Sequence, residues 1–394
     1  MTDPPAAPRL WPFWSPRAHT RLDSLLDSDL TGTRTAEPVV ELEELTRRVL
    51  SPDRRVLACS SGTAALASAY AALGLSPGAE VLVPTMGFRA TATPLLALGL
   101  VPVLCDAEPG AGGVDLGDAA ARVTSRTEAL VVTHLWGRPV DLDAARAFAD
   151  RYRLALVEDC SHAHGARWQG RPVGSVADVA VWSMGTTKPV SGAMLGVLAA
   201  RDGAVFDRAV VFGQPKHRAR RTGGVLAQIA MTGVGHNLRP GVLHAALAAD
   251  HLSRLEDILQ VRNARQAGFE ELLAGREGWR SWERAPGHTH GALYKWHAAT
   301  SDPAAAVAAL SRAGMRARRP AAPLHRLPAF ADPGLARALL PQARPPVSRG
   351  PFPAADALCE ELVEFDARDA YDPDHDPLPG YARALNALTF QESR

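Results

Sequence analysis

The chain has 394 residues, of which 46% are hydrophobic and 22% charged, and its formal net charge is +1. This length and composition are typical of a soluble globular protein with more than one structural unit. The near-neutral charge argues against a nucleic-acid partner, and no apolar run approaches the roughly 20 residues of a membrane span.

The cysteines and the N-terminus indicate a cell compartment. Four cysteines are scattered along the chain without a C-x-x-C pair, which favours reduced thiols over a disulfide framework or a zinc site. Asp3 stands in a proline-rich N-terminus ahead of any apolar run, so a signal peptide is not expected. We therefore expect a cytoplasmic protein without a membrane partner.

Residues 1–36 are expected to form an irregular N-terminal arm with one short helix near residues 21–26. The arm carries three aromatic side chains, Trp11, Phe13 and Trp14. They could pack on a partner subunit, but packing on the body of the same chain is the simpler expectation.

After the arm, helical and strand patterns alternate. Helices are expected over residues 37–50, 64–73, 90–98 and 141–152, and strands over residues 55–59, 80–84, 101–106, 129–135, 154–159 and 179–182. Such alternation predicts a mostly parallel sheet covered by helices on both faces. Ligands of such sheets bind at the carboxyl ends of the strands.

Beyond the last of these strands the pattern becomes mixed. Strands are expected over residues 193–200, 293–299 and 315–319, and helices over residues 242–273, 303–313 and 354–364. We therefore expect an α/β protein with a large sheet domain over residues 37–240. A linking helix at residues 241–275 would join it to a smaller C-terminal α+β domain at residues 276–394.

The turn Ser60-Ser61-Gly62-Thr63 lies between a predicted strand and a predicted helix. A helix start offers unpaired N–H groups and the positive end of the helix dipole, so it favours a phosphate. Thr63 can add a hydroxyl donor, and Gly62 lets the backbone approach closely. Taken alone, the same residues also describe an ordinary helix cap.

Two further residues follow predicted strands. Phe88 could stack on an aromatic cofactor, although an isolated phenylalanine is more often part of a core. Asp159 ends a buried strand, where a carboxylate can keep a pyridinium nitrogen protonated and so preserve the electron sink of a pyridoxal ring. The alternatives are a capping or ion-paired carboxylate, or a metal ligand together with His162 and His164. No further cluster with ligand spacing supports the metal, so none is expected.

Lys188 follows a strand and a small polar loop that begins at Ser183. In a desolvated pocket at a strand end, a lysine amine loses its proton near neutral pH and can form a Schiff base with a cofactor aldehyde. The same amine could carry protons between substrate and cofactor carbons, and Ser183 could reach a phosphate. Alone, Lys188 would be read as a surface lysine, but the set as a whole fits pyridoxal 5′-phosphate.

On these residues and their motifs, the chain resembles the DegT/DnrJ/EryC1/StrS family of pyridoxal-phosphate-dependent sugar aminotransferases. The strongest motifs are S-S-G-T-A-A-L (60–66), V-P-T-M-G-F-R-A-T-A (83–92), H-L-W-G-R-P-V-D-L-D (134–143), V-E-D-C-S-H-A-H-G-A (157–166) and W-S-M-G-T-T-K (182–188). Two later motifs, G-H-N-L-R (235–239) and P-L-H-R-L-P-A-F (323–330), support them. The resemblance extends from residue 37 to the C-terminal helix.

The resemblance implies fold type I, a large cofactor-binding domain and a homodimer with active sites at the subunit interface. It implies that Lys188 is the Schiff-base lysine and that Asp159 partners the pyridine nitrogen. Phe88 would stack on the ring, and His162 would lie beside the cofactor. The phosphate would be held by Gly62, Thr63, Ser183 and, from the other subunit, Asn237.

Two segments depart from the family pattern near the expected substrate position. The family's Gly-Glu/Asp-Gly-Gly turn after the lysine is replaced by the shorter segment Pro189–Gly196, which lacks the acid. Leu238 stands where the family usually has an aromatic residue, next to Arg239. Arg239 and His325 are candidates for substrate contact, and His162 resembles the cyclitol-type branch more than the nucleotide-sugar branch.

We therefore expect a transaminase of bacterial sugar or natural-product biosynthesis. Glutamate or glutamine would convert the cofactor to pyridoxamine 5′-phosphate, and a keto-sugar or keto-cyclitol would then take the amine. Two alternatives stay open: another pyridoxal-phosphate reaction, such as dehydration, decarboxylation or oxidation, and a cofactor-binding homologue without turnover. The family's dehydratases carry histidine in place of the lysine, so Lys188 argues against dehydration. The basic loop Lys216–Arg221 could receive a nucleotide diphosphate, although a solvated surface loop is the favoured interpretation.

Overall fold

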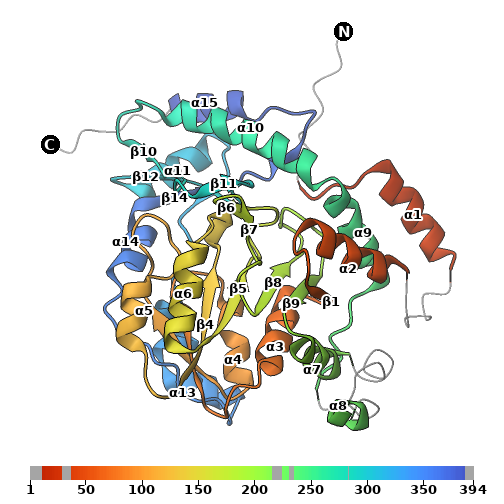
Figure 1. Ribbon diagram of the computed structural model, residues 1–394. Helices are drawn as coiled ribbons and strands as arrows, with labels where there is room; N and C mark the ends of the chain where they lie inside the picture. The colour runs from red at the N-terminus through yellow and green to blue at the C-terminus, as the bar shows by residue number, and fades with distance from the viewer. Residues whose placement is uncertain (1–10, 29–36, 215–223, 230–234, 283, 387–394) are drawn as a thin grey trace.

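The computed structural model describes residues 11–28, 37–214, 224–229, 235–282 and 284–386 (Figure 1). At its centre is a seven-stranded sheet in the order β1-β9-β8-β5-β4-β2-β3. Its strands are β1 (Arg55–Cys59), β2 (Glu80–Pro84), β3 (Val101–Cys105), β4 (Thr127–Thr133), β5 (Ala155–Asp159), β8 (Val179–Ser183) and β9 (Gly196–Ala200). Only β9 runs against its neighbours within this sheet, so the expected mostly parallel sheet is confirmed.

Helices cover both faces of this sheet because the strands are apolar on both sides. One face is covered by α3 (Gly62–Ala72), α4 (Thr93–Ala97) and α7 (Gly203–Gly213), and the other by α2 (Glu37–Val49), α5 (Leu116–Arg122), α6 (Leu142–Tyr152) and α9 (Val242–Ser253). On β8, Val179 and Val181 pack into the core of the first face, while Ala180 and Trp182 pack into that of the second. A strand buried on both faces reads as a continuous apolar run, as it does here.

Side-chain caps fix where helices begin after strands. Ser61 Oγ accepts a hydrogen bond of 3.1 Å from the Ala64 N–H at the start of α3. The carboxylate of Asp141 accepts bonds of 3.0 Å from the N–H groups of Asp143 and Ala144 at the start of α6. Both caps satisfy donors that the helix itself leaves unpaired, in agreement with the sequence prediction.

The C-terminal part of the chain builds a second, antiparallel sheet in the order β10-β12-β14-β13. Its strands are β10 (Trp279–Ser281), β12 (Trp296–Thr300), β13 (Ala317–Arg318) and β14 (Leu362–Phe365). Helices α10 (Leu255–Leu273), α11 (Pro303–Arg312) and α15 (Leu378–Asn386) pack on it around an aromatic core that includes Phe269, Trp296 and Phe365. This sheet is the smaller α+β unit that the sequence predicted.

A third, short sheet ties the two parts together. Its order is β11-β6-β7, with β6 (Arg167–Trp168) and β7 (Arg171–Pro172) from the first part and β11 (His288–His290) from the second. The remaining helices are α1 (Pro16–Leu26), α8 (Gly224–Ile229), α12 (Pro328–Ala331), α13 (Pro333–Leu339) and α14 (Pro353–Glu361), with 3₁₀ turns η1 (Arg89–Thr91), η2 (Leu135–Gly137), η4 (Leu324–Arg326) and η5 (Asp369–Tyr371). We keep the division into residues 1–36, 37–240, 241–275 and 276–394 as a prediction.

Three element predictions were wrong in detail. The helix expected over residues 354–364 ends at Glu361, and strand β14 follows, because Leu362–Phe365 pairs with two strands that are distant in sequence. The single linking helix is two helices, α9 and α10, which meet at Arg254. The helix expected over residues 90–98 is split into η1 and α4, and a proline stands in the first turn of α4.

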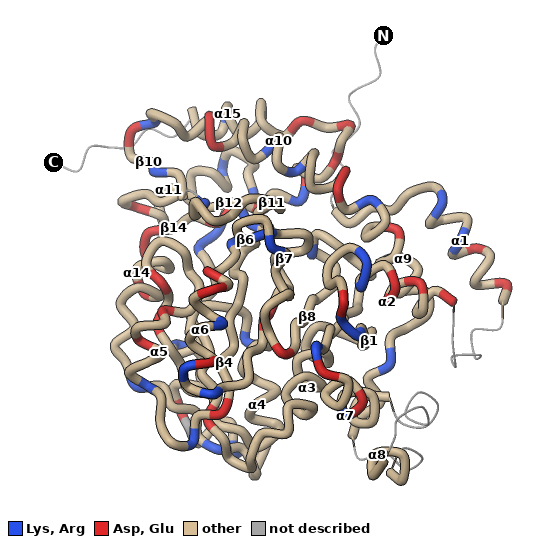
Figure 2. Tube along the Cα trace, viewed as in Figure 1, with Lys and Arg blue, Asp and Glu red and all other residues tan. Residues whose placement is uncertain are grey.

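The described surface carries both signs of charge. Figure 2 shows lysine and arginine interspersed with aspartate and glutamate along the tube, in keeping with the net charge of +1. None of the helices in the described ranges combines the length and apolar composition that crossing a bilayer requires. The aromatic arm packs on its own chain as expected, because Trp11 is 2% exposed and contacts Ile258 and Tyr371.

Gly196 supplies a test of the fold. A β-carbon added there would lie 2.5 Å from the backbone nitrogen of Gly62 and from the carbonyl of Ser61. We expect Gly196→Ala to lower the free energy of unfolding by about 1–3 kcal/mol, because backbone atoms cannot move aside as a side chain can. Chemical denaturation of both proteins measures the difference.

Gly203→Ala is the matched control, since its added methyl would meet only the end of the Arg55 side chain, at 3.3 Å. Its stability should stay close to that of the native protein. Equal losses in the two variants would contradict the proposed close approach of β9 to the start of α3.

Candidate active site

The carboxyl ends of the parallel strands open into a cavity of about 370 Å³. Most of the residues that the sequence singled out line it: Gly62, Thr63, Phe88, Asp159, His162, Ser183 and Lys188. They come from four separate segments of the chain. The fold therefore brings together residues that sequence alone could connect only through their positions after strands.

One end of the cavity is built by the start of α3 and the end of β8. Gly62 is the first residue of α3, and a β-carbon on it would lie 2.5 Å from Ser183 Cβ, so only glycine fits. Thr63 stands beside it in the first turn, where helix N–H groups have no helical partner. This end combines unpaired donors, two hydroxyl groups and the positive end of a helix dipole, which together suit a phosphate.

Asp159 lies at the end of β5 and is 4% exposed. Its Oδ2 accepts a hydrogen bond of 2.8 Å from Thr91 Oγ1, and its Oδ1 accepts one of 3.1 Å from the Ser161 N–H. Both bonds stabilise the charged carboxylate and fix its orientation at the cavity wall. A protonated ring nitrogen in the cavity would find a held anionic partner here.

His162 is buried and neutral. Burial, followed by the nearby charge of Lys188, holds the pKa of His162 well below its ordinary value. Its Nδ1 accepts a hydrogen bond of 3.1 Å from the Trp136 N–H, so a neutral ring carries its proton on Nε2. His162 is therefore a hydrogen-bond donor at the cavity wall.

Lys188 is the central titratable group of the cavity. Burial is the largest cause and lowers its pKa. The charge of Asp159 raises it, that of Lys295 lowers it and that of Glu364 raises it, and the net pKa is about 7. Its Nζ lies 4.5 Å from the centre of the Tyr294 ring. At neutral pH a substantial fraction of this amine is uncharged, which is the form that can attack an aldehyde.

The sequence reasoning missed a group that the C-terminal part contributes to the same cavity. Tyr294 stacks on His162 at 4.6 Å between ring centres, and its hydroxyl lies 2.6 Å from Thr187 Oγ1. Lys295 Nζ pairs with Glu364 at 3.3 Å, and both side chains line the cavity. Tyr294 precedes strand β12, and Glu364 lies on the unpredicted strand β14, so only the second sheet brings them here.

Glu364 acts as the anionic anchor of this group. Burial pushes the pKa of Glu364 upward, but the His297 ring, whose Nε2 lies 3.7 Å from Oε2, and the charges of Lys295 and Arg318 bring it to about 2. Arg318 Nη2 lies 2.6 Å from Glu364 Oε1. Glu364 therefore stays charged and holds two cations at the edge of the cavity.

Phe88 and Met194 stand at the rim of the cavity, where they are 52% and 62% exposed. The Arg89 guanidinium lies 4.8 Å from the centre of the Phe88 ring. Stacking of Phe88 on a cofactor stays a prediction. Two large apolar side chains at an open rim are unusual on a free surface.

Three predicted residues lie outside the cavity lining of this chain. Asn237 and Arg239 are exposed and contact each other, with Arg239 Nε donating to Asn237 Oδ1 at 2.8 Å. His325 Nδ1 lies 2.8 Å from Thr85 Oγ1, and His325 Nε2 lies 3.0 Å from Asp356 Oδ1. The basic loop Lys216–Arg221 falls outside the described residues.

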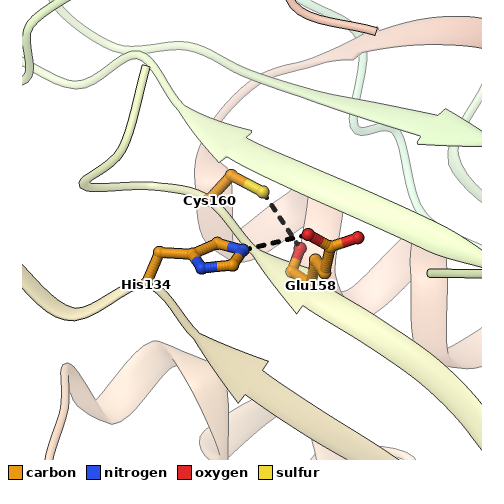
Figure 3. Close-up of side chains that lie close together, drawn as sticks. All are labelled: His134, Glu158 and Cys160. Carbon is orange, nitrogen blue, oxygen red and sulfur yellow. Dashed lines mark hydrogen bonds and ion pairs between the residues drawn. The ribbon is translucent and has the colours of Figure 1, made fainter. Parts of the chain in front are cut away.

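One group of potential metal ligands comes together in the described ranges, and it is not the Asp159-His162-His164 group considered above. It consists of His134, Glu158 and Cys160, which are buried and lie close together (Figure 3). His134 Nε2 is 3.0 Å from Glu158 Oε2.

The hydrogen bonds of this group occupy its potential ligand atoms. Glu158 also accepts bonds of 2.6, 3.0 and 2.8 Å from the N–H groups of Gly174, Val176 and Ala177. The other ring nitrogen of His134 accepts a bond of 3.2 Å from the Val140 N–H. Burial raises the pKa of Glu158, but His134 and these N–H groups reverse the shift and lower it. The group is a closed structural network that fixes β5, and it does not suit a metal ion.

The residues present fit pyridoxal 5′-phosphate. A glycine whose β-carbon would collide with Ser183 marks a cradle at the phosphate end. A buried carboxylate, a neutral histidine donor and an amine of lowered pKa occupy the other walls. These are the partners that the phosphate, ring nitrogen, ring oxygen and aldehyde of this cofactor require.

Comparison with known proteins shows which family has a similar sequence. A model of the DegT/DnrJ/EryC1/StrS aminotransferase family matches residues 18–363. The chain is 31% identical over 318 residues to L-glutamine:scyllo-inosose aminotransferase of Streptomyces griseus, covering 77% of this chain and 74% of that protein. It is 31% identical over 314 residues to L-glutamine:2-deoxy-scyllo-inosose aminotransferase of Streptomyces paromomycinus, covering 75% and 72%.

Solved structures share the fold over nearly the whole chain. The sugar aminotransferase CalS13 from Micromonospora echinospora superposes with a TM-score of 0.79 at 25% identity, covering 96% of this chain and 98% of that one. 3-Amino-5-hydroxybenzoic acid synthase superposes with a TM-score of 0.79 at 24% identity, covering 97% and 99%, and shows the shared fold.

The lowered pKa of Lys188 makes a testable prediction. In the cofactor-free protein, the rate at which Lys188 combines with added pyridoxal 5′-phosphate should rise with pH and reach half its maximum near pH 7. Below that pH the amine is protonated and unreactive. Absorbance stopped-flow over a pH series measures the midpoint.

Lys295 provides the matched pair of variants. Because its charge lowers the pKa of Lys188, Lys295→Met should move the midpoint to higher pH, whereas Lys295→Arg should leave it in place. A native midpoint near that of a free lysine, or the same midpoint in Lys295→Met as in the native protein, would contradict this account.

Proposed function

The chain belongs to the DegT/DnrJ/EryC1/StrS aminotransferase family, and we propose that it moves the amino group of L-glutamine to a keto-cyclitol of the scyllo-inosose class. The observation that carries the proposal is Lys188, an amine of lowered pKa, in one cavity with the buried carboxylate of Asp159. The names of relatives about one third identical supply the donor and the acceptor class.

Each cavity residue has a proposed role toward pyridoxal 5′-phosphate. Asp159 would pair with the ring nitrogen, His162 would donate from Nε2 to the ring oxygen, and Phe88 would cover the ring. The phosphate would be held by Gly62, Thr63 and Ser183. When bound, the cofactor supplies an electron sink for the pair left behind when the substrate loses its Cα proton.

Lys188 is the group that moves protons. Its neutral amine accepts a proton at Nζ, and the resulting ammonium returns it to a second carbon. A pKa of about 7 suits both directions, because neither the charged nor the neutral form is strongly favoured at neutral pH. Tyr294 covers the amine on one side and limits its access to water.

A second copy of the chain would complete the site. The exposed apolar side chains Phe88 and Met194 stand at the rim, and contact with a partner would cover them. Asn237 is exposed and does not line the cavity of its own chain, as expected if it reaches the phosphate of the other subunit. These observations support a homodimer with shared active sites. All four cysteines are buried, as is common for thiols of cytoplasmic proteins, which supports a cytoplasmic location.

Two other functions were considered. A different reaction of the same cofactor remains chemically accessible, because the segment after Lys188 lacks the family's acidic turn. A cofactor-binding homologue without turnover is disfavoured, because the proton-carrying amine and the carboxylate are both in place in one cavity. Transfer of nitrogen from the donor to the acceptor distinguishes the aminotransferase from both.

Lys188→Ala tests the central role. The native protein with pyridoxal 5′-phosphate should show the absorbance band of lysine-bound cofactor, and the variant should not. Amine transfer should fall by roughly 10²-fold or more, because the proton carrier is lost. Lys295→Met is the control for loss of a cavity lysine and should keep the band. A native protein that never binds the cofactor would refute the proposal.

The substrate assignment has its own test. With L-glutamine as donor, a keto-cyclitol such as scyllo-inosose should be aminated faster than a nucleotide-linked keto-sugar, by roughly tenfold or more. Mass spectrometry of the aminated product, with ¹⁵N-labelled glutamine, measures both reactions in parallel. A clear preference for the nucleotide-linked acceptor would overturn the assignment and leave the aminotransferase activity standing.

A further inference from the structure

The N-terminal arm reaches the backbone of the central lysine. Residues Trp11–Ser15, here called the aromatic strap, cross the loop that follows Lys188. Trp11 Nε1 donates a hydrogen bond of 2.7 Å to the carbonyl oxygen of Lys188, although the two residues are 177 positions apart. Pro189, which follows Lys188, has no backbone N–H group to donate.

Trp11 is held in place on both faces of its ring. It stacks on His251 of α9 at 4.3 Å between ring centres and on Tyr371 of η5 at 4.5 Å. Its own backbone N–H donates to the Arg368 carbonyl at 3.3 Å. Trp11 is 2% exposed, so water has little access to its indole N–H as an alternative acceptor.

His251 ties the strap to the same loop a second time. Its Nδ1 accepts a hydrogen bond of 3.1 Å from the Ser191 N–H, which places the proton of the neutral ring on Nε2. Nε2 lies 2.9 Å from the Phe13 carbonyl oxygen and donates to it. The strap ends where the Ser15 N–H and hydroxyl bind Asp250, also on α9.

These contacts fall on the segment in which the chain departs from its family. Pro189–Gly196 lacks the acidic glycine turn. Trp11 binds the carbonyl of Lys188 directly before this segment, and His251 and Trp14 bind Ser191 within it. We propose that Trp11 is a positioning residue for amine transfer, because its indole N–H holds the carbonyl of Lys188 itself. This inference rests on the proposed function, because it assigns Trp11 a role through Lys188.

The physical argument is that a proton carrier must be placed to within a fraction of an ångström. The side chain of Lys188 is long and flexible, so its Nζ position depends on how firmly its backbone is held. The Trp11 hydrogen bond holds that backbone directly, and stacking on His251 and Tyr371 restrains the Trp11 indole itself. Losing the bond would leave a partly buried carbonyl without this donor and would loosen the backbone of Lys188.

Trp11→Phe in the full-length chain tests the proposal, because it removes the N–H and keeps an aromatic ring between His251 and Tyr371. We expect the rate constant for combination of the cofactor-free protein with pyridoxal 5′-phosphate to fall about tenfold. The kcat of amine transfer should fall by a similar factor, about tenfold, while the KM values for donor and acceptor change less than about twofold. Such a split follows from a misplaced amine and not from damaged substrate binding.

Trp14→Phe is the matched control. It is the same substitution in the same strap, but Trp14 Nε1 donates its hydrogen bond of 3.4 Å to the Ser191 carbonyl, three residues beyond Lys188. Both rate constants should stay within about twofold of native. If Trp11→Phe fails to fold, His251→Gln is tested in its place. This variant removes one of the rings that stack on Trp11 and should show the same fall in both rate constants.

The outcomes are separable. Native rates in Trp11→Phe, or equal losses in Trp11→Phe and Trp14→Phe, overturn the role of Trp11. A fall in both rate constants for Trp11→Phe alone supports it. If the native protein itself never combines with pyridoxal 5′-phosphate, the proposed function fails, and that result is distinct because it does not depend on any variant.

Discussion

The centre of this structure depends on keeping one amine partly uncharged among carboxylates. Burial lowers the pKa of Lys188 to about 7, although Asp159 and Glu364 both favour its charged form. The second part of the chain shifts this balance, because it supplies Tyr294 as an apolar cover and Lys295 as a competing cation. The two sheets must therefore be assembled together before the lysine acquires its reactivity.

Neighbouring carboxylates on one strand serve different purposes. Glu158 points to one side of β5 and is saturated by His134 and three backbone N–H groups, so it stabilises the strand and binds nothing else. Asp159, on the other side, is held by Thr91 and Ser161 and lines the cavity. The alternation of a strand thus separates a structural acid from a functional one, one residue apart.

The sequence predicted the features that depend on local pattern. Apolar runs, caps such as Ser61 and Asp141, and polar residues after strands were enough to place Lys188, Asp159 and Gly62 at one edge of a parallel sheet. It could not predict β14, whose residues read as the end of a helix until they pair with β12 and β13. The same pairing places Glu364, which is why that residue and its cations were missed. Tyr294 and Trp11 were missed as site residues for the same reason, since only long-range contacts give them a role.

The antiparallel strand β9 fixes both ends of the loop that carries Lys188. Gly196 pairs with Ser183 on one side and with Cys59 on the other, so the loop that carries Lys188 leaves and re-enters the sheet at adjacent positions. A loop closed at its base in this way can gain or lose residues at small entropic cost while the strand ends stay fixed. The segment after the lysine can therefore change in length or sequence while Ser183 and Gly196 at its base keep their pairing, so the sheet tolerates variation at this point.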